Sequence, residues 1–590
     1  MNNGKSDFKM TSALLFRLLP IQVLLAMIGA VNGIVSSLFA SNFVGVDAMS
    51  AVGLYSPINL LIGAFSTMLV GGSGILCGRY MGRNEPEKMQ GVFSTDLIFS
   101  VVLAVLFTVL LLIMGVFDLT GFFTQDETIR RIFNSYLIGQ AAGILPFIVG
   151  NQLSAFLSLE NKNRRTTVAS LIYIGVNLLF NYLFVNLFRM EALGLALASS
   201  LGMWVFCIVE ALYFLQPDAH LRFDLTDLHL HAGLEIAKIG IPGAAATGYQ
   251  AVRGILVNKL VLAFVGGAGL SAFAAANTLL GFVWALPGGM LAVSRMLISI
   301  SLGEEDRRTL KDVFMNMFFR FIPLMCALVL LLIALAEPLT RLYYRDPLDP
   351  VYQMTVWGFR ILPLCMPLSI VCMHFVCYGQ ASGKQFLVHL LSILDGVVFV
   401  AGFTAILIRF IGMNSVYVAN VLNGIGCIAV IVLYACFRYK RVPKTLDELM
   451  VIPENFGAAE EDRIDVTVRN MEEVVTVAEK VHAFCRKKGI DERRAYFAGL
   501  FMEEMAGNVV GHGFLKDNKK HTVETRTVYK DGSVILRIKD DCIPFDPAER
   551  KEIADPDDAA KNIGIRMVYR MARDIQYQNI LGLNVLTIRI

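Results

Sequence analysis

The sequence is poor in charged residues. Only 17% of its 590 residues are Asp, Glu, Lys or Arg, whereas soluble globular domains carry about a quarter. Hydrophobic residues make up 55%, and the mean hydropathy is +0.59. This composition excludes an ordinary soluble protein and indicates a membrane protein. The net charge of +3 is spread along the chain without a basic arm, so nothing points to a nucleic-acid partner.

Three further features are missing. The ten cysteines have no metal-ligand spacing and mostly lie in apolar runs, which indicates reduced, structural thiols. The N-terminus leads directly into a long apolar run without an A-x-A-like cleavage site, so we expect a retained first span. A G-x-x-x-x-G-K-[ST] loop is also missing, which argues against primary ATP-driven export.

Long apolar runs recur until Tyr434. A helix needs about 20 apolar residues to cross a hydrocarbon core of about 30 Å, and twelve runs reach that length. Lys and Arg gather in alternate connecting segments, which predicts the bacterial inner membrane with both termini in the cytoplasm. The expected spans are 13–41, 51–78, 92–116, 132–158, 166–187, 192–215, 238–265, 269–300, 311–336, 352–379, 385–409 and 414–437.

The apolar region contains an internal repeat. AVNGI (30–34) matches AVRGI (251–255), and GRNE (82–85) matches GEED (303–306), at the offset of 221 residues that also relates Phe43 to Phe264. Two homologous halves of six helices in the same orientation place a substrate path between them. The predicted fold is an all-α membrane bundle of twelve transmembrane helices in two six-helix repeats, followed by a C-terminal α/β sandwich domain. The predicted divisions are 1–215 (first lobe), 216–237 (linker), 238–441 (second lobe), 442–462 (linker) and 463–590 (soluble domain).

Several motifs in the two halves occur in one order. Each half has an early proline, an FVG turn after its first span and a GR or GE loop after its second, and the first half has Asn177 followed by Asn181. In the order and duplication of these motifs, residues 10–440 resemble the multidrug and toxic compound extrusion family. The resemblance implies export of small organic compounds against a flow of Na⁺ or H⁺, by two lobes that rock about a central cavity. The sequence departs from the family at three cation-binding positions, which are neutral here, near Ala40 and at Asn181 and Gln250.

A few polar residues lie inside the predicted spans. A charge at the centre of a membrane helix costs about 2.5–3.5 kcal/mol on insertion scales, so such residues normally face a partner, a ligand or the bundle interior. Arg253 lies one helical turn from Gln250, and either lines the transport cavity or forms a structural ion pair with Asp395. The candidate cavity residues are Asn32, Asn177, Asn181, Gln250, Arg253 and Asp395.

The C-terminal region carries four segments of interest. A helix over 496–514 places Glu504, Asn508 and His512 four residues apart on one face. The strand over 534–547 ends in an acid, the segment NIGI at 562 opens a helix, and NVLTIRI closes the chain. An isolated E-x-x-x-N would be an ordinary solvated helix face. All four in this order resemble the gyrase and histidine-kinase ATPase superfamily, and most of all its anti-sigma-factor serine kinases, over about residues 463–590.

The resemblance implies roles for individual residues. Glu504 would be the catalytic group that orients or deprotonates the attacking hydroxyl or water. Asn508 would coordinate Mg²⁺, a hard cation that takes oxygen ligands and substrate phosphates. Asp540 would accept from the adenine amino group of ATP, supported by Thr587. Backbone N–H groups around Asn562 and Gly564, at a helix start, would cradle phosphate.

Two functions follow from this architecture. In the first, an ion-coupled antiporter exports small organic compounds and is modulated by its cytoplasmic ATP-binding domain. In the second, the membrane part is a sensor, and the ATPase domain phosphorylates or sequesters a protein partner. Because Asp540-Asp541-Cys542 stands where the family has Asp-x-Gly, the domain is either a serine protein kinase or an ATP-binding pseudoenzyme. The expected partners are a small-molecule substrate, the lipid bilayer and, in the second case, a protein.

Overall fold

The first lobe consists of six long helices. The computed structural model describes residues 8–39, 46–122, 127–217, 219–224, 230–344, 346–454, 456–515, 521–530, 532–547 and 563–590. Helix α5 continues through a π-helical turn, η3 (Tyr182–Leu187). The helices of this lobe are α1 (Phe8–Phe39), α2 (Val46–Arg83), α3 (Pro86–Val116), α4 (Glu127–Leu159), α5 (Asn163–Asn181) and α6 (Glu191–Phe214).

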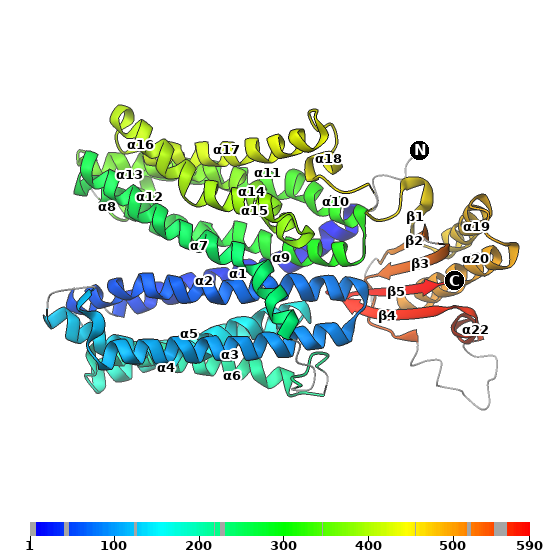
Figure 1. Ribbon diagram of the computed structural model, residues 1–590, viewed down its shortest axis with the longest axis horizontal. Coiled ribbons are helices and arrows are strands. Elements are labelled where there is room, and N and C mark those ends of the chain that lie inside the picture. Colours follow the sequence, from blue (N-terminus) through cyan, green and yellow to red (C-terminus); the bar gives the residue numbers. More distant parts are fainter. Residues whose placement is uncertain are drawn as a thin grey trace.

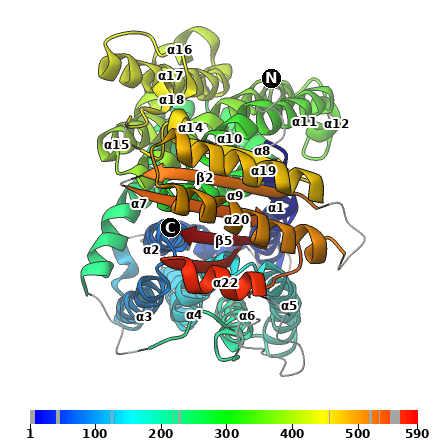
Figure 2. The same cartoon turned by 90° about the vertical axis from the view of Figure 1, so that its right-hand side faces the viewer.

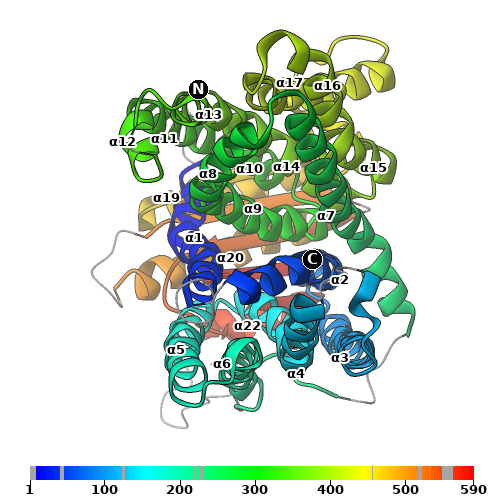
Figure 3. The ribbon, with the colours of Figure 1, turned by 90° about the vertical axis from the view of Figure 1, so that its left-hand side faces the viewer.

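The second lobe repeats this arrangement with more interruptions. Its predicted spans are split by short 3₁₀ or π-helical turns, such as the π-helical turns η4 (Met317–Phe321) and η6 (Leu394–Val398). The helices are α7 (Leu230–Phe264), α8 (Gly267–Val283), α9 (Ala285–Gly303), α10 (Arg307–Asn316), α11 (Ile322–Ala334), α12 (Ala336–Arg341), α13 (Pro350–Ile361), α14 (Cys365–Ser382), α15 (Gln385–Ile393), α16 (Phe399–Ile411) and α17 (Asn414–Tyr439). Figure 3 shows the two lobes as separate groups of helices, α2 to α6 below and α7 to α17 above, with α1 beside them.

Ten helical segments in the described part are long and apolar enough to cross a membrane. They coincide with ten of the twelve predicted spans. Of the other two predicted spans, 13–41 and 238–265, residues 13–39 lie in α1 and residues 238–264 in α7. The fold prediction for the membrane region is therefore confirmed.

The lobes pack closely at the end of the bundle that carries the C-terminal domain. A Cβ atom on Gly82 of α2 would lie 2.2 Å from the carbonyl oxygen of Ile300, and one on Gly303 of α9 would lie 2.1 Å from that of Arg79. Gly82 and Gly303 occupy the same position in the two halves of the repeat. The main-chain oxygen of Ala381, in α14 of the second lobe, also accepts a hydrogen bond from the Arg79 guanidinium of the first lobe. The bundle is thus closed at this end.

The C-terminal domain is a two-layer α/β sandwich, as predicted. Its sheet is antiparallel with strand order β1-β2-β3-β5-β4. Three helices cover one face of the sheet, and the other face turns toward the membrane helices (Figures 1 and 2). The elements are β1 (Arg463–Val468), α19 (Met471–Lys487), α20 (Glu492–Asn508), β2 (Val523–Lys530), β3 (Ser533–Asp540), α22 (Ile563–Met571), β4 (Asp574–Ile580) and β5 (Leu583–Arg589).

Side chains along each strand alternate between the two faces of the sheet, and the two faces have different environments. In β3 the side chains of Leu536, Ile538 and Asp540 are buried on the helix-covered face. Arg537 and Lys539 therefore point to the opposite face, because successive side chains of a strand alternate. One face of the sheet thus builds the apolar core of the domain, while the other presents charged residues to the membrane bundle.

The segment between the bundle and the domain is also anchored. The predicted linker 442–462 contains a short helix, α18 (Leu446–Met450), with Met450 and Ile452 buried against the bundle. Lys311 of α10 forms an ion pair with Asp447 at 3.3 Å. The domain is therefore tethered to the second lobe before its first strand begins.

Candidate nucleotide-binding site and docking face

A cavity of about 290 Å³ lies between α20, the ends of β3 and β5, and α22. Asp540, at the end of β3, is 5% exposed and accepts a hydrogen bond from Asn584 Nδ2 at 2.8 Å. The amide of Cys542 donates to the same carboxylate oxygen at 3.0 Å. Burial raises the pKa of the Asp540 carboxyl, and these hydrogen bonds partly offset the rise. The cavity therefore has an oriented polar group among apolar side chains, the usual design of a small-molecule site.

A short network holds this floor in place. Tyr577 of β4 donates from its hydroxyl to Asn584 Oδ1 at 2.8 Å, and the amide of Phe545 donates to the Tyr577 oxygen at 3.0 Å. Asn584 also donates to the carbonyl of Cys542 at 3.1 Å. The β4–β5 hairpin and the segment after β3 are thus joined directly beneath the cavity.

The structure brings some of the predicted nucleotide residues together. Asn508, at the end of α20, lines the same cavity as Asp540. Glu504 lies one turn earlier, against the start of α22, where a Cβ atom on Gly564 would be 1.9 Å from Glu504 Oε2. A larger residue at position 564 would displace the Glu504 side chain, so Gly564 allows the carboxylate to reach the helix start. Asn562 lies outside the described residues.

Thr587 is placed differently from the prediction. It pairs with Arg537 across β3 and β5, so both side chains lie on the face turned toward the membrane helices. Asp540 instead pairs with Asn584 across β3 and β5, so Asn584 is the β5 residue that lies beside Asp540. Asn584 and Thr587 are three residues apart on β5, and successive side chains of a strand point to opposite faces. The Thr587 side chain therefore points away from the cavity. Counting alternation back from Leu586 would have selected Asn584 from the sequence.

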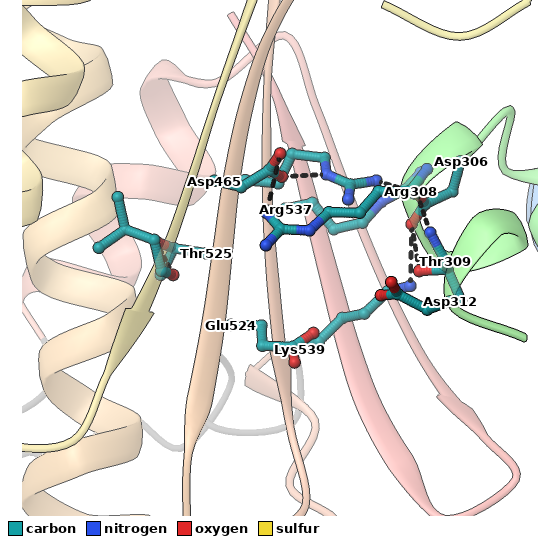
Figure 4. Close-up of a pocket in the computed structure, with 11 residues that line it drawn as sticks. Asp306, Arg308, Thr309, Asp312, Asp465, Glu524, Thr525, Arg537 and Lys539 are labelled. Atoms are coloured by element: carbon teal, nitrogen blue, oxygen red, sulfur yellow. Dashed lines mark hydrogen bonds and ion pairs between the residues drawn. The ribbon is translucent and has the colours of Figure 1, made fainter. Parts of the chain in front are cut away.

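The opposite face of the sheet docks on the loop between α9 and α10 through a network of ion pairs (Figure 4). Arg526 of β2 contacts Asp306 of the loop at 2.5 Å and Asp465 of β1 at 2.5 Å. Lys539 and Arg537 of β3 contact Glu304 at 2.7 and 3.2 Å. The Glu304 and Asp306 side chains are 2% and 1% exposed, so these pairs are almost fully desolvated.

The charges on the two strands are complementary to this loop. Arg526 and Arg537 lie directly opposite each other in the sheet, an arrangement that destabilises strand pairing unless it is neutralised. Asp306 and Glu304 supply the opposite charges. Burial alone would raise the pKa of Asp306, but Arg526 and Lys539 outweigh burial and hold it well below its usual range. Asp306 is therefore ionised, and both loop acids lie opposite the cations that the sheet presents.

The β4–β5 hairpin makes a second contact, with the first lobe. Its two-residue turn, Leu581 and Gly582, has positive φ at both positions (53° and 83°), as in type I′ turns. Arg17 of α1 donates to the carbonyl of Leu581 at 2.6 Å, and Asn161, after α4, lies beside Gly582. Leu581 tolerates a conformation that is unusual for a non-glycine residue because its side chain is buried against the bundle. The domain thus contacts both lobes.

The predicted transport-cavity residues separate into two groups. Asn177 and Asn181 are fully buried inside the first lobe, where the Asn181 amide donates to the Asn177 oxygen. Gln250 is exposed on α7. Asn32 belongs to the part of α1 whose side chains fall outside the described residues.

Of the two alternatives for Arg253, the ion pair with the Asp395 side chain does not form in the structure. Arg253 Nη1 donates to the main-chain oxygen of Asp395 at 3.4 Å. The carboxylate of Asp395 instead accepts from Asn423 Nδ2 at 2.7 Å. The Arg253 side chain therefore reaches Asp395 through the main chain, at the π-helical turn that contains Asp395.

Comparisons with known proteins agree with both regions. Residues 23–183 match the MatE family, and residues 441–590 match the histidine kinase-like ATPase domain. A probable multidrug resistance protein NorM of Halalkalibacterium halodurans is 23% identical over 353 residues, which are 56% of this chain and 74% of that protein. Multidrug export protein MepA of Staphylococcus haemolyticus is 21% identical over 383 residues, 63% of this chain and 83% of that protein.

Solved structures share the fold of the membrane region. A MATE transporter in complex with MaD3S aligns with a TM-score of 0.66 at 20% identity, covering 73% of this chain and 96% of that one. An outward-facing MATE family transporter aligns with a TM-score of 0.65 at 19% identity, covering 74% and 97%. The chain is thus a multi-pass membrane protein in which a MatE domain is fused to a histidine kinase-like ATPase domain.

Proposed function

Because a MATE-type transporter fold is joined in this chain to a histidine kinase-like ATPase domain, we propose that the protein exports small organic compounds and that ATP modulates this export. The names of the relatives NorM and MepA support the export function. We further propose Na⁺ or H⁺ as the coupling ion. The protein would reside in the bacterial inner membrane, with both termini and the C-terminal domain in the cytoplasm, where ATP is available.

The residues of the cavity fit a nucleotide. The buried carboxyl of Asp540 would accept from the exocyclic amino group of adenine, and Asn584 orients that carboxyl. Asn508, on the cavity wall, would offer its amide oxygen to Mg²⁺, which takes oxygen ligands. Bound Mg²⁺ and ATP would supply a phosphoryl group, and Glu504 would orient an acceptor hydroxyl. With or without phosphoryl transfer, these side chains would distinguish a nucleotide whose base carries an exocyclic amino group from one whose base lacks it.

The observation that carries the modulation is the double contact of the domain. The ion-pair network attaches the sheet to the second lobe, and the β4–β5 hairpin contacts Arg17 of the first lobe. Tyr577 and Asn584, beneath the cavity, belong to that same hairpin. A nucleotide that shifts Asn584 would act on the contact with the first lobe while the second lobe stays attached. The closed end of the bundle must separate for substrate to enter from this side, so the domain would control that step.

A protein partner is the second candidate. In the described part of the chain, every residue that lines the cavity belongs to the C-terminal domain, and α20 and α22 lie on the side away from the bundle (Figures 1 and 2). A partner protein could therefore reach the nucleotide without displacing the membrane region. In that case the acceptor hydroxyl would come from a serine of the partner, and the membrane part would act as a sensor.

Transport into vesicles separates the two candidates. Purified protein in liposomes would be given a fluorescent organic cation and an imposed Na⁺ or H⁺ gradient, with and without Mg²⁺-ATP on the side of the C-terminal domain. We expect gradient-driven flux that ATP changes by about fivefold or more, the usual scale of coupling between sites. Asn508→Ala should abolish the ATP response, while the control Thr587→Ala, on the other face of the sheet, should retain it. Absence of gradient-driven flux in every condition would favour the sensor.

A further inference from the structure

The second lobe brings two thiols and a carboxylate together inside the membrane region. Cys372 of α14, Asp395 of η6 and Cys427 of α17 place their ligand atoms within 4.8 Å of one another. Cys427 Sγ lies 4.0 Å from Asp395 Oδ1 and 3.8 Å from Asn423 Oδ1. We propose that these residues form a binding site for a thiophilic divalent cation of the Zn²⁺ type, independent of the transported compound and of ATP.

The spacing of the donors suits such a cation. In tetrahedral sites Zn–S bonds are about 2.3 Å and Zn–O bonds about 2.0–2.2 Å, which separates neighbouring donors by roughly 3.5–3.8 Å. The observed separations exceed this by only a few tenths of an ångström between Cys427 and its two oxygen neighbours. The Cys372 sulfur lies within 4.8 Å of the ligand atoms of Cys427 and Asp395, so a bound cation would draw it closer. A mixed sulfur and oxygen set favours a borderline cation over Mg²⁺ or Ca²⁺, which take oxygen only.

The surroundings of Asp395 also indicate a cation. A carboxylate inside a membrane helix normally has a partner, yet among the described residues that of Asp395 forms no ion pair and has only the neutral Asn423 as its close hydrogen-bond donor. Cys372 and Cys427 are 4% and 0% exposed, whereas Asp395 is only partly buried, so the site is enclosed on the thiol side and reachable from the carboxylate side.

The backbone around Asp395 departs from a regular α-helix. Asp395 lies in a π-helical turn, a feature found frequently at functional sites. Next to it, a Cβ atom on Gly396 would lie 2.4 Å from Cβ of Tyr249, so α7 approaches the turn closely. The neighbouring Arg253 contacts the main chain of Asp395 and would balance the excess negative charge of two thiolates and a carboxylate around one divalent ion.

The first lobe offers a built-in contrast. At the repeat offset of 221 residues, the counterparts of Cys372, Asp395 and Cys427 are Asn151, Ile174 and Phe206. The donor set is therefore not a packing requirement of the six-helix repeat. Its two cysteines lie 55 residues apart in the sequence, which explains why cysteine spacing gives no sign of the site.

Titration of the full-length protein with Cd²⁺ tests the site. The protein would be purified in detergent, stripped with a chelator and kept reduced with a phosphine. We expect ultraviolet absorption from thiolate–Cd²⁺ charge transfer that saturates at about one equivalent and is reversed by Zn²⁺. Cys372→Ala and Cys427→Ala should each lose it, and Asp395→Asn should weaken the affinity about tenfold or more. The controls Cys326→Ala and Cys436→Ala change thiols outside the cluster and should leave the titration unchanged.

The outcomes that overturn the proposal are distinct. The site does not exist if the reduced wild type, with its thiols counted by a thiol reagent, shows no such absorption. The same holds if the absorption persists in a Cys372→Ala and Cys427→Ala double variant. A Cys372–Cys427 disulfide in the unreduced protein, with no Cd²⁺ binding after reduction, would identify a redox pair instead. Should the alanine variants fail to accumulate, Asp395→Asn retains the shape of the site and decides the question alone.

Discussion

The two halves of the repeat differ most in the loop that follows the second span of each. In the first half this loop reads Gly82-Arg83-Asn84-Glu85, and in the second half Gly303-Glu304-Glu305-Asp306. The glycines keep their role, since each packs against the main chain of the other lobe. The residues that follow the two glycines have different environments, because Arg83 is exposed whereas Glu304 is buried beneath Lys539 and Arg537.

This difference explains where the C-terminal domain sits. A sheet face that presents Arg526, Arg537 and Lys539 can dock only on an acidic loop, and only the second half provides one. The first lobe is contacted by the hairpin instead, where Arg17 donates to the carbonyl of Leu581. One lobe thus has a charged, buried attachment, and the other has a smaller contact adjacent to the nucleotide cavity. We infer that the contact between the hairpin and the first lobe is the one that changes during the transport cycle.

The largest effect is expected from making the second loop resemble the first. Glu304→Arg would place a third cation beside Lys539 and Arg537 in a nearly dry site, where an uncompensated charge costs about 3–5 kcal/mol. We expect the domain to undock, with faster hydrogen exchange in peptides spanning 303–309 and 524–539. The matched control Arg83→Glu changes an exposed residue of the first loop and should leave both peptides protected. Unchanged exchange in Glu304→Arg would mean that the network does not hold the domain.

A somewhat smaller effect is expected at Asp306. This residue accepts from the amides of Arg308 and Thr309 at 3.0 Å and so caps α10, a role that Asn fills equally well. Asp306→Asn therefore removes the charge without the cap. Arg526 would keep Asp465 as its remaining partner, so we expect docking to weaken by about 2–3 kcal/mol. Glu85→Gln, at the equivalent position of the first loop, should have no effect on the same exchange measurement.

Glu524 gives docking a mild pH dependence. Its side chain lies on the docking face, and burial raises its pKa from 4.5 to about 7, against the lowering effect of Lys539 and Arg308. A raised carboxyl pKa means that the docked state binds an extra proton, so docking is strongest below the ordinary pKa and weakens as pH rises through 7. Asp306, whose pKa is lowered, stays ionised throughout this range.

We therefore expect docking to be about tenfold weaker at pH 8 than at pH 6. Glu524→Gln should remove most of this dependence and strengthen docking at pH 8. Hydrogen exchange of peptide 303–309 at the two pH values provides the measurement, corrected for the intrinsic exchange rate. An equal pH dependence in wild type and variant would assign the effect to another group.

Much of this arrangement could be predicted from the sequence. Apolar length located the spans, the repeat offset paired the two loops, and the order of motifs placed Asn508 and Asp540 at one cavity. The docking face could not be predicted in this way, because Arg526 and Arg537 are outward residues of alternating strands and look like an ordinary solvated surface. Their partners on the loop, Asp306 and Glu304, lie more than two hundred residues away in the sequence. Thr587 was assigned to the cavity because the motif was read without its strand parity. The alternative ion pair between Arg253 and Asp395 does not form, because helix periodicity does not reveal a π-helical turn.

The central claim is that the nucleotide state can reach the transporter only while the domain is held on the acidic loop of the second lobe. It is tested most directly by the ATP response of gradient-driven flux in liposomes for the wild type, Glu304→Arg, and Glu304→Arg combined with Arg537→Glu and Lys539→Glu. Our account predicts that Glu304→Arg still transports but no longer responds to Mg²⁺-ATP, and that the combined variant, with its charges exchanged, regains the response. An undiminished ATP response in Glu304→Arg, in protein shown by hydrogen exchange to be undocked, would contradict it.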